Sequence, residues 1–357
     1  MKKLKYIIII FSFITIFLTG CSVNTITKIS DEVEYTKIEN DITQTYDDVK
    51  GGCVAIVSRT AEAVASGSGV IIRYDKTTDT YYVVTNNHVI EEALSTYIYF
   101  NENRYNLATI IGGDSTNDIA VLKFQLDPFN ESIRNEIKVH DIFNYEDNDM
   151  LAIGQTVLAI GCPLSLSNFN QLSTGVVSKI SKTQLTVDCA LNPGNSGGGL
   201  FNLAGRLIGI VNQKTSYVPH GTSTIPAEGL NYAIPLSVVK VAINDIISTN
   251  KSVSRPTLGI TLGTINSILT PDLYEQYKDY IPVDGSYVHF VVMSFAEDSK
   301  AQQYGLLLND VILKINGTTV SSNEDIAYIL HTTLTGDITL SVYRAKTGLL
   351  DIVVKYE

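Results

Sequence analysis

The sequence predicts a mainly β protein, with a domain of β-barrels followed by a smaller α+β domain. Short apolar runs separated by turn residues recur from Cys53 to Val211, which is typical of barrels built from short strands. A polar linker, Ser248–Ser254, then precedes a second segment. The 357 residues, 45% hydrophobic and 18% charged, are enough for two or three domains with sizeable cores.

The expected strands of the first domain follow its apolar runs. They cover Val54–Val57, Gly69–Ile72, Tyr81–Val84, Tyr97–Phe100, Ile119–Phe124, Val157–Ile160 and Leu207–Val211. The more polar segment 124–150 is interpreted as the crossover between two barrels, with a short helix around residues 130–137. Pro235 precedes the apolar-rich stretch Leu236–Ile247, and a first-turn proline favours a helix there. We assign residues 46–250 to the first domain and 255–357 to the second.

The N-terminal residues predict export. Lys2, Lys3 and Lys5 precede the apolar run Tyr6–Leu18, which is short for a membrane span but fits a secretory signal. The sequence Leu-Thr-Gly-Cys that ends at Cys21 resembles a bacterial lipobox, which implies cleavage before Cys21 and acylation of its thiol. We therefore predict a lipoprotein signal peptide over residues 1–20 and a lipid anchor on the outer face of the bacterial cell membrane. An uncleaved membrane anchor is the alternative.

Residues 21–45 are rich in polar side chains without a sustained apolar period, which indicates a solvated tether. A few apolar residues there, Val33, Tyr35 and Ile38, could instead dock on a neighbouring subunit. The net charge of −11 argues against nucleic acid as a partner, because such binding needs a basic face.

Ser196 lies in the glycine-rich stretch Leu191–Gly199. Glycines there let the backbone turn sharply and direct the amides of Gly194 and Ser196 at one point, as in an oxyanion hole. We name Gly194, Asn195 and Ser196 as its candidate residues. A glycine-rich hairpin is one alternative. A phosphate-binding loop is another, although its Lys-Ser/Thr pair does not follow the glycines.

A serine nucleophile needs a base and an acid that orients the base. Of the five histidines, His88 stands where an expected strand ends and a turn follows. Asp118 leads directly into an apolar strand, although an Asp there is also a common turn residue. The order His88, Asp118, Ser196 is the order found in chymotrypsin-like enzymes.

Together these segments resemble the HtrA/Deg family of trypsin-like serine proteases with a PDZ domain. The matching segments are Gly67–Ile72, Thr85–Val89, Asn117–Lys123, Leu158–Gly161, Asn192–Gly198 and Gly229–Pro235. The resemblance implies a chymotrypsin-like double β-barrel, a homotrimer, and an ATP-independent endopeptidase that degrades or processes misfolded or damaged exported proteins. Gly199 and Cys162 depart from the family's usual proline and asparagine, but neither position supplies triad chemistry.

The second segment resembles an HtrA-type PDZ domain, with a generic small α+β domain as the alternative. Such domains bind a C-terminal peptide as an added strand and capture its carboxylate with backbone amides. The resemblance places Leu258, Gly259 and Ile260 in the capture loop. Thr257 stands where the family often has an aromatic residue, which leaves the peptide affinity open.

The residue six before the nucleophile forms the bottom of the primary pocket in trypsin-like folds, and here it is Ala190, with Leu191 beside it. An unpaired ammonium in such an apolar pocket would cost several kcal/mol. The sequence therefore predicts cleavage after small or medium apolar residues. Asp188 is the nearby acid that could change this preference.

Besides Cys21, the cysteines are Cys53, Cys162 and Cys189, which we interpret as buried free thiols, with at most one internal disulfide as the alternative. No spacing suggests a metal, and no cofactor motif is found. Two other functions remain open. One is a chaperone or peptide-binding module with a mostly idle protease domain, and the other is a regulatory protease that cuts one signalling protein.

Overall fold

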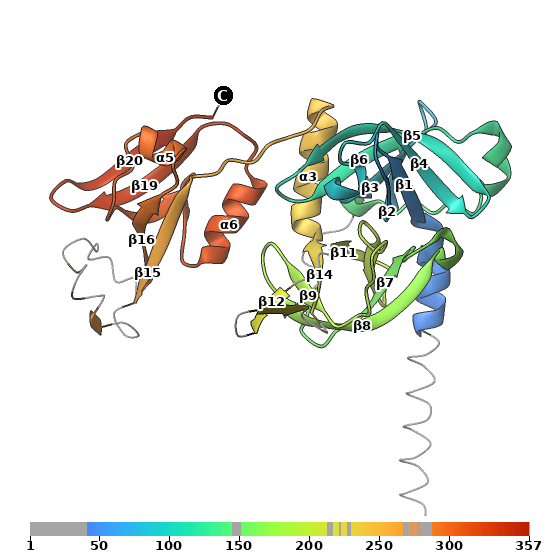
Figure 1. The fold of residues 1–357 in the computed structure, drawn as a ribbon, viewed down its shortest axis with the longest axis horizontal. Coiled ribbons are helices and arrows are strands. Elements are labelled where there is room, and N and C mark those ends of the chain that lie inside the picture. Colours follow the sequence, from blue (N-terminus) through green and yellow to red (C-terminus); the bar gives the residue numbers. More distant parts are fainter. Residues whose placement is uncertain are drawn as a thin grey trace, which may run out of the picture.

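The computed structural model describes residues 41–356, apart from 145–150, 213–216, 221–222, 227–229, 267–270, 273–274, 276–277 and 279–287. The predicted signal peptide, Cys21 and most of the tether lie outside the described residues. Figure 1 shows two β-barrels side by side, helix α3 along them, and a separate sheet domain beyond that helix. Within the described residues no helix is long and apolar enough to cross a membrane.

The first barrel is closed by six antiparallel strands of the described chain, in the order β1-β2-β3-β6-β5-β4. These strands are β1 (Cys53–Arg59), β2 (Val64–Asp75), β3 (Thr80–Thr85), β4 (Ser95–Asn101), β5 (Arg104–Asp114) and β6 (Ile119–Phe124). Side chains of Ile56, Ile71 and Leu122 point into its core and are fully buried. The one-turn helix α2 (Asn87–Ile90) follows β3.

The second barrel, also closed by six described strands, has the order β10-β11-β14-β9-β8-β7. These strands are β7 (Thr156–Gly161), β8 (Gln171–Ile180), β9 (Leu185–Val187), β10 (Gly199–Asn202), β11 (Leu207–Asn212) and β14 (Asn231–Pro235). The short strands β12 (Tyr217–His220) and β13 (Ser223–Pro226) pair as a hairpin outside the barrel. The 3₁₀ helices are η1 (Lys50–Gly52), η2 (Pro128–Ile133), η3 (Ile142–Asn144) and η4 (Leu166–Asn168).

Each strand expected from an apolar run lies within an observed strand. The strands that the apolar runs did not indicate include β5 and β8, whose residues are largely exposed or half-buried. The short helix expected around residues 130–137 is a 3₁₀ helix, η2, that begins earlier, at Pro128. The Asp127 carboxylate accepts a hydrogen bond from the Phe129 amide and so caps it.

Two helices cover the core between the barrels. Helix α3 (Leu236–Thr249) buries Val239, Ile243 and Ile246 there, close to its expected bounds. Residues 41–49 form a second helix, which crosses the expected boundary between tether and protease domain at residue 46. Its Ile42 and Tyr46 pack against the same core, so part of the expected tether belongs to the protease fold.

The C-terminal domain is a small α+β unit, as predicted. Its sheet runs β15-β16-β17-β19-β20, with β18 paired to β17. The strands are β15 (Ile260–Asn266), β16 (Val288–Phe295), β17 (Val311–Ile315), β18 (Thr318–Thr319), β19 (Ile338–Arg344) and β20 (Gly348–Val354). Helices α5 (Lys300–Gln303) and α6 (Asn323–Thr332) accompany the sheet, and α6 packs Ile326 into the domain core.

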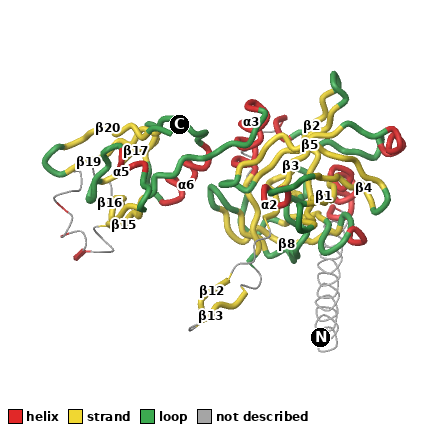
Figure 2. Tube along the Cα trace, turned by 45° about the horizontal axis from the view of Figure 1, so that its top comes forward, coloured by secondary structure: helices red, strands yellow, loops and turns green. Residues whose placement is uncertain are grey.

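Helix α6 also docks the C-terminal domain onto the barrels, where it contacts α3 (Figures 1 and 2). Tyr328 packs against the core between the barrels, and Asp325 forms an ion pair with Lys182. At the end of α6, His331 Nδ1 and Asn117 Oδ1 lie 2.8 Å apart, while Asn117 Nδ2 donates to the His331 carbonyl over 2.8 Å.

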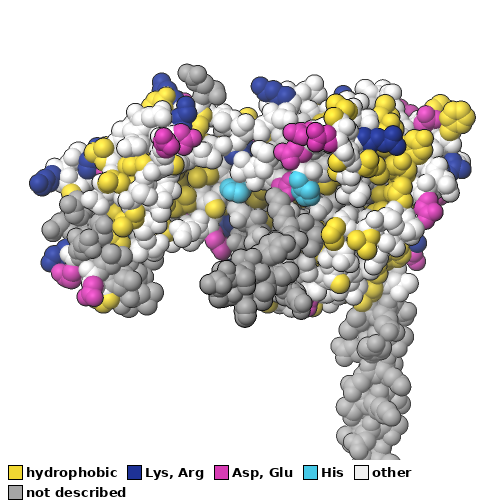
Figure 3. Space-filling view, viewed as in Figure 1, with side chains coloured by type: hydrophobic (Ala, Val, Ile, Leu, Met, Phe, Trp, Pro, Cys, Tyr) yellow, Lys and Arg dark blue, Asp and Glu magenta, His cyan; other side chains and the backbone are white. Residues whose placement is uncertain are grey.

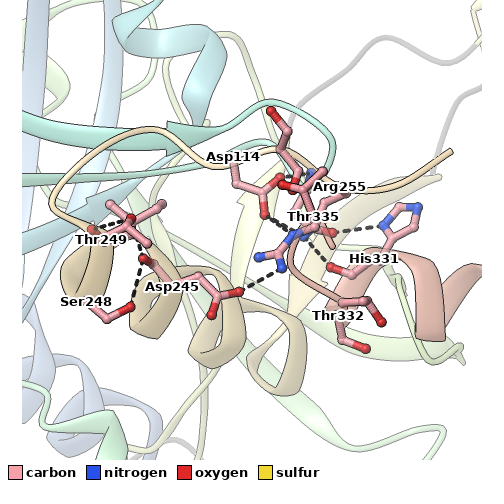
Figure 4. Close-up of polar contacts among 12 residues, drawn as sticks. Asp114, Asp245, Ser248, Thr249, Arg255, His331, Thr332 and Thr335 are labelled. Atoms are coloured by element: carbon pink, nitrogen blue, oxygen red, sulfur yellow. Dashed lines mark hydrogen bonds and ion pairs between the residues drawn. The ribbon is translucent and has the colours of Figure 1, made fainter. Parts of the chain in front are cut away.

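The linker between the domains is fixed by a buried charge cluster (Figure 4). Arg255 Nε donates to Asp114 over 2.7 Å, and both side chains are 0% exposed. Arg255 Nη1 reaches Asp245 on α3, also over 2.7 Å. Because a buried charge is tolerated only when it is paired, this cluster fixes where the linker leaves the barrels.

Candidate active site

The three residues predicted as a catalytic triad come from both barrels. His88 lies on α2 directly after β3, and Asp118 lies in the turn between β5 and β6, so both belong to the first barrel. Ser196 lies in the loop between β9 and β10 of the second barrel. The candidate site is therefore at the contact between the barrels.

His88 is held by Asp118 through two hydrogen bonds. The imidazole Nδ1 lies 2.8 Å from Asp118 Oδ2, and the His88 backbone amide donates to Asp118 Oδ1 over 3.0 Å. Because a carboxylate only accepts, the proton belongs on Nδ1, which leaves Nε2 with a lone pair. The Asp118 side chain is 6% exposed and the His88 side chain 36%, so the imidazole is fixed from its buried side and open to a substrate.

The turn that carries Asp118 is itself constrained. Asp118 has φ +55, a left-handed conformation that Asp adopts more easily than most residues. The Asp114 carboxylate accepts from the Asn117 amide and side chain over 3.0 and 2.7 Å. Asn86 Nδ2 donates to the Asp118 carbonyl over 2.8 Å. These buried contacts fix the direction of the Asp118 carboxylate.

Ser196 is 5% exposed and approaches the His88 segment across Gly67. A Cβ at Gly67 would lie 2.7 Å from the Val89 side chain, closer than real Cβ atoms come, and 3.1 Å from the Ser196 carbonyl, a tight contact. Among the described residues, Ser196 Oγ forms no hydrogen bond with His88. In structures without substrate this contact is often longer and tightens when substrate binds.

Every carbonyl from Asn192 to Ser196 accepts a hydrogen bond. The carbonyls of Asn192, Pro193 and Asn195 accept from the amides of Asn195, Leu164 and Gly198 over 3.0, 2.9 and 2.9 Å. The Gly194 carbonyl accepts from the Ser68 hydroxyl and the Ser196 carbonyl from the Ser68 amide, each over 2.7 Å. The amides of Gly194 and Ser196 have no acceptor among the described residues. The loop can therefore present these two N–H groups to an oxygen beside the Ser196 hydroxyl.

The two candidate pocket residues differ in their environment. Ala190 is exposed, whereas Leu191 is 8% exposed and packs in the core of the second barrel. Asp188 is exposed, and its Oδ1 accepts from the Val176 amide on β8 over 2.6 Å. One oxygen of its carboxylate is therefore bound to the backbone of the barrel.

The cysteines of the described chain are free and buried. Burial raises the pKa of the Cys162 thiol to about 11. Burial, together with the charge of Asp188, raises the pKa of the Cys189 thiol to about 12. Burial also raises the pKa of Cys53. Since the thiolate is the nucleophilic form, these cysteines are inert near neutral pH. Among the described residues no cluster of His, Cys, Asp and Glu could hold a metal ion.

In the C-terminal domain, Leu258 and Gly259 directly precede β15, and Ile260 is its first residue. The Leu258 carbonyl accepts from the Ser299 hydroxyl over 2.9 Å, and the Gly259 carbonyl accepts from the Ala296 amide over 2.9 Å. Gly259 has φ +63. Both carbonyls are thus turned toward the segment after β16.

Sequence reasoning did not single out several residues that shape the site. Ser68 and Asn86 stand inside segments that carried the family resemblance, so their positions were marked but their contacts were not. Leu164 has φ +66, which is uncommon for a large side chain, and its amide holds the Pro193 carbonyl. Nothing in the local sequence indicates that conformation.

Comparisons with known proteins identify both domains. A family model described as a trypsin-like peptidase domain matches residues 67–210, and one described as a PDZ domain matches residues 291–344. The serine protease Do-like HtrA of Lactococcus lactis subsp. lactis is 32% identical over 92% of this chain and 81% of its own length. The serine protease Do-like HtrA of Lactobacillus helveticus is 28% identical, over 95% of this chain and 87% of its own length.

Solved structures show the same fold. The HtrA-type protease AlgW with a tripeptide aligns with a TM-score of 0.66 and 24% identity, over 88% of this chain and 95% of that one. The serine endoprotease from Yersinia pestis aligns with a TM-score of 0.60 and 24% identity, over 88% and 96%.

Fold and site define a trypsin-like serine peptidase that carries a C-terminal PDZ domain. Within this class, the identity to the Lactococcus lactis HtrA shows that the chain belongs to the HtrA family of serine proteases.

Proposed function

We propose that Ser196, His88 and Asp118 form the catalytic triad of this protease. The observation that carries the proposal is the pair of hydrogen bonds that fixes His88 on Asp118 and leaves Nε2 available. The adjacent Ser196 loop supports the proposal. Its carbonyls from Asn192 to Ser196 all accept hydrogen bonds, whereas the amides of Gly194 and Ser196 donate none within the described residues.

The chemistry follows from these positions. Ser196 Oγ attacks the peptide carbonyl carbon while His88 Nε2 accepts its proton, and Asp118 stabilises the imidazolium. The negative oxygen that forms is bound by the amides of Gly194 and Ser196, with Asn195 between them. His88 then returns the proton to the leaving amine. Water hydrolyses the acyl-enzyme by the same route in reverse.

We further propose that the protein acts outside the cytoplasm on misfolded or damaged exported proteins, anchored to the membrane by lipid on Cys21, as a homotrimer. The lipobox-like sequence supports the anchor. Two or more acyl chains would hold the protein at the membrane stably where one would not. Acyl labelling of the parent protein and of Cys21→Ser tests the anchor, since the variant should not incorporate label. A parent protein without label would favour the uncleaved membrane anchor.

The PDZ domain is proposed to bind C-terminal peptides between β15 and α6. Half-buried apolar side chains stand on both elements, Ile260 and Leu262 on the strand and Ile329 and Leu330 on the helix. A peptide added along β15 would lay alternate side chains against them. Leu258, Gly259 and Ile260 are the residues proposed to capture its carboxylate.

The triad is tested by substitution in the purified protein. Ser196→Ala should abolish cleavage of an unfolded protein such as casein while the thermal midpoint stays unchanged. His88→Ala should be about as severe and the double variant little worse, because triad members act as a unit. Undiminished proteolysis by Ser196→Ala would contradict the assignment. A parent protein that binds unfolded chains but does not cut them would favour the chaperone function.

A further inference from the structure

We propose that Ser68 is a positioning residue that holds the oxyanion hole in its active conformation. The inference rests on the proposed function of the Ser196 loop. Ser68 lies on β2 in the first barrel, whereas the loop belongs to the second. Its role is therefore to join the two halves of the site.

The geometry of the peptide bond shows how the hole is set. In a trans peptide the carbonyl and the following N–H point in opposite directions. The Pro193 carbonyl is held by the Leu164 amide over 2.9 Å, and the Asn195 carbonyl by the Gly198 amide over 2.9 Å. The N–H groups of the same two planes, those of Gly194 and Ser196, are thereby turned the other way.

The next peptide plane after each of these two is held by a hydrogen bond from Ser68. Its hydroxyl donates to the Gly194 carbonyl over 2.7 Å, and its amide donates to the Ser196 carbonyl over 2.7 Å. The plane between Gly194 and Asn195 and the plane after Ser196 are thus fixed by one residue. The orientation of four successive peptide planes, from Pro193 to Gly197, is therefore fixed by hydrogen bonds to their carbonyls. Ser68 donates two of these four hydrogen bonds.

Ser68 is itself fixed by two hydrogen bonds that it accepts. Its Oγ accepts from the Cys162 amide over 2.8 Å, and its carbonyl accepts from the Thr85 hydroxyl over 2.7 Å. The residue is 1% exposed. Thr85 ends the strand β3, after which α2 carries His88. Through Ser68, the strand that leads to the base is connected to the loop that carries the nucleophile.

The chain leaves room for this contact at a glycine. A Cβ at Gly197 would lie 2.1 Å from the Ser68 carbonyl and 2.3 Å from the Thr85 hydroxyl. No real side chain tolerates those distances. The glycine that follows Ser196 therefore permits the close approach that lets Ser68 reach the loop.

Removal of the Ser68 hydroxyl would leave the Gly194 carbonyl and the Cys162 amide without their partner in the interior. An unsatisfied buried group is costly, so the loop would rearrange to find one. Gly194 has φ +100, and glycine can leave that conformation without steric penalty. We expect the Gly194 plane to rotate and the hole to be formed only part of the time.

The test compares Ser68→Ala with Ser58→Ala in the full chain. Ser58 is 0% exposed, and its hydroxyl lies 3.1 Å from Thr96 Oγ1, within the first barrel. It is therefore a matched loss of a buried hydroxyl away from the loop. For Ser68→Ala, kcat on an apolar fluorogenic peptide should fall about 10- to 100-fold, somewhat less than the loss of a whole oxyanion donor. KM should change little, and Ser58→Ala should keep the parent kcat.

A second measurement reports on the hole directly. The tetrahedral adduct of a peptide boronate places a negative oxygen there, so its inhibition constant should weaken for Ser68→Ala by a factor similar to the fall in kcat. Ser68→Cys, whose thiol is a weak donor, should lie between parent and Ala and serves if Ala does not fold. A folded Ser68→Ala protein with the parent's kcat and boronate affinity overturns the proposal, as does an equal loss in Ser58→Ala. A parent as inactive as Ser196→Ala would overturn the triad assignment instead.

Discussion

At the scale of the residue, the contact between His88 and Asp118 decides what the candidate site can do. One carboxylate accepts from both the backbone and the imidazole of His88, so it sets the position and the tautomer together. The sequence predicted the partners from an Asp before an apolar strand and a His after one. The left-handed turn at Asp118 could not be predicted, because Asn86, which holds the Asp118 carbonyl, comes from a segment 32 residues away.

Asp118→Asn tests the tautomer. The amide keeps the shape of the side chain, but its NH₂ group facing Nδ1 would favour the tautomer with the proton on Nε2. That tautomer cannot accept the proton of Ser196. By analogy with other serine proteases, kcat should fall about 10⁴-fold, with little change in the thermal midpoint. Activity within tenfold of the parent, in a folded variant, would contradict the proposed role.

The pocket prediction is also a matter of single residues. With Ala190 at its base, the enzyme should cut an unfolded protein after Val, Ala, Ile or Leu, with weak discrimination among them, since one methylene is worth about 1–3 kcal/mol. Mass spectrometry of the cleavage products gives the sites.

Two variants make the pocket test sharper. Ala190→Asp should move cleavage toward Lys and Arg, whereas Asp188→Asn should not change specificity, because that carboxylate is bonded to the Val176 amide. Parent cleavage mainly after Lys or Arg would show that the pocket is elsewhere.

Among helices and strands, those whose side chains are mostly buried could be predicted from the sequence, and those that are mostly exposed could not. Runs such as Ile119–Leu122 are continuously apolar because that part of the strand is buried on both faces, so their composition reveals them. Strand β8 is exposed or half-buried along most of its length and gives no such signal. The helix over residues 41–49 was missed because few of its side chains pack on the barrels and the rest are polar.

That helix should contribute measurably to stability. Val49 is 2% exposed, Ile42 and Tyr46 pack on the core, and Thr45 and Tyr46 donate to the carbonyls of Leu203 and Asn170 over 2.8 and 2.9 Å. Fully burying an apolar side chain contributes roughly 1.5–3 kcal/mol. A Ser196→Ala chain that begins at Lys50 should therefore melt well below one that begins at Asp41. Equal midpoints would show that the helix is only a tether.

At the scale of the whole molecule, helix α6 joins the protease domain to the PDZ domain. Its apolar residues form one wall of the proposed peptide groove, while Asp325, Tyr328 and His331 contact the barrels. Sequence patterns marked both domains and their linker. They could not show this docking, because Asn117 and His331 are 214 residues apart in sequence.

The docking should weaken in mild acid. Burial lowers the pKa of His331 below its ordinary 6.5, with Arg255 acting the same way and Asp114 opposing. The undocked imidazole therefore binds a proton more readily than the docked one. The stabilisation is fully present above about pH 6.5 and is lost as pH falls below it. Lys182 lowers the pKa of Asp325, so that ion pair should survive in this range.

Small-angle scattering of the Ser196→Ala protein should accordingly show a more extended molecule at about pH 5.5 than at about pH 7.5, on either side of the ordinary histidine pKa. His331→Gln is the matched control, since an amide can still donate to Asn117 Oδ1 but does not titrate. It should remove most of this pH dependence. The same change with pH in the variant and the parent would assign the effect to other groups.

If Ser196 is a nucleophile activated by His88, a covalent serine-directed reagent should label it, and the rate should depend on His88. A biotinylated fluorophosphonate should form one adduct with the parent protein, and peptide mapping should place it on Ser196. His88→Ala should label far more slowly, and Ser196→Ala should not label. An adduct on another residue, or labelling of Ser196 at the same rate without His88, would show that His88 does not activate Ser196 as the nucleophile.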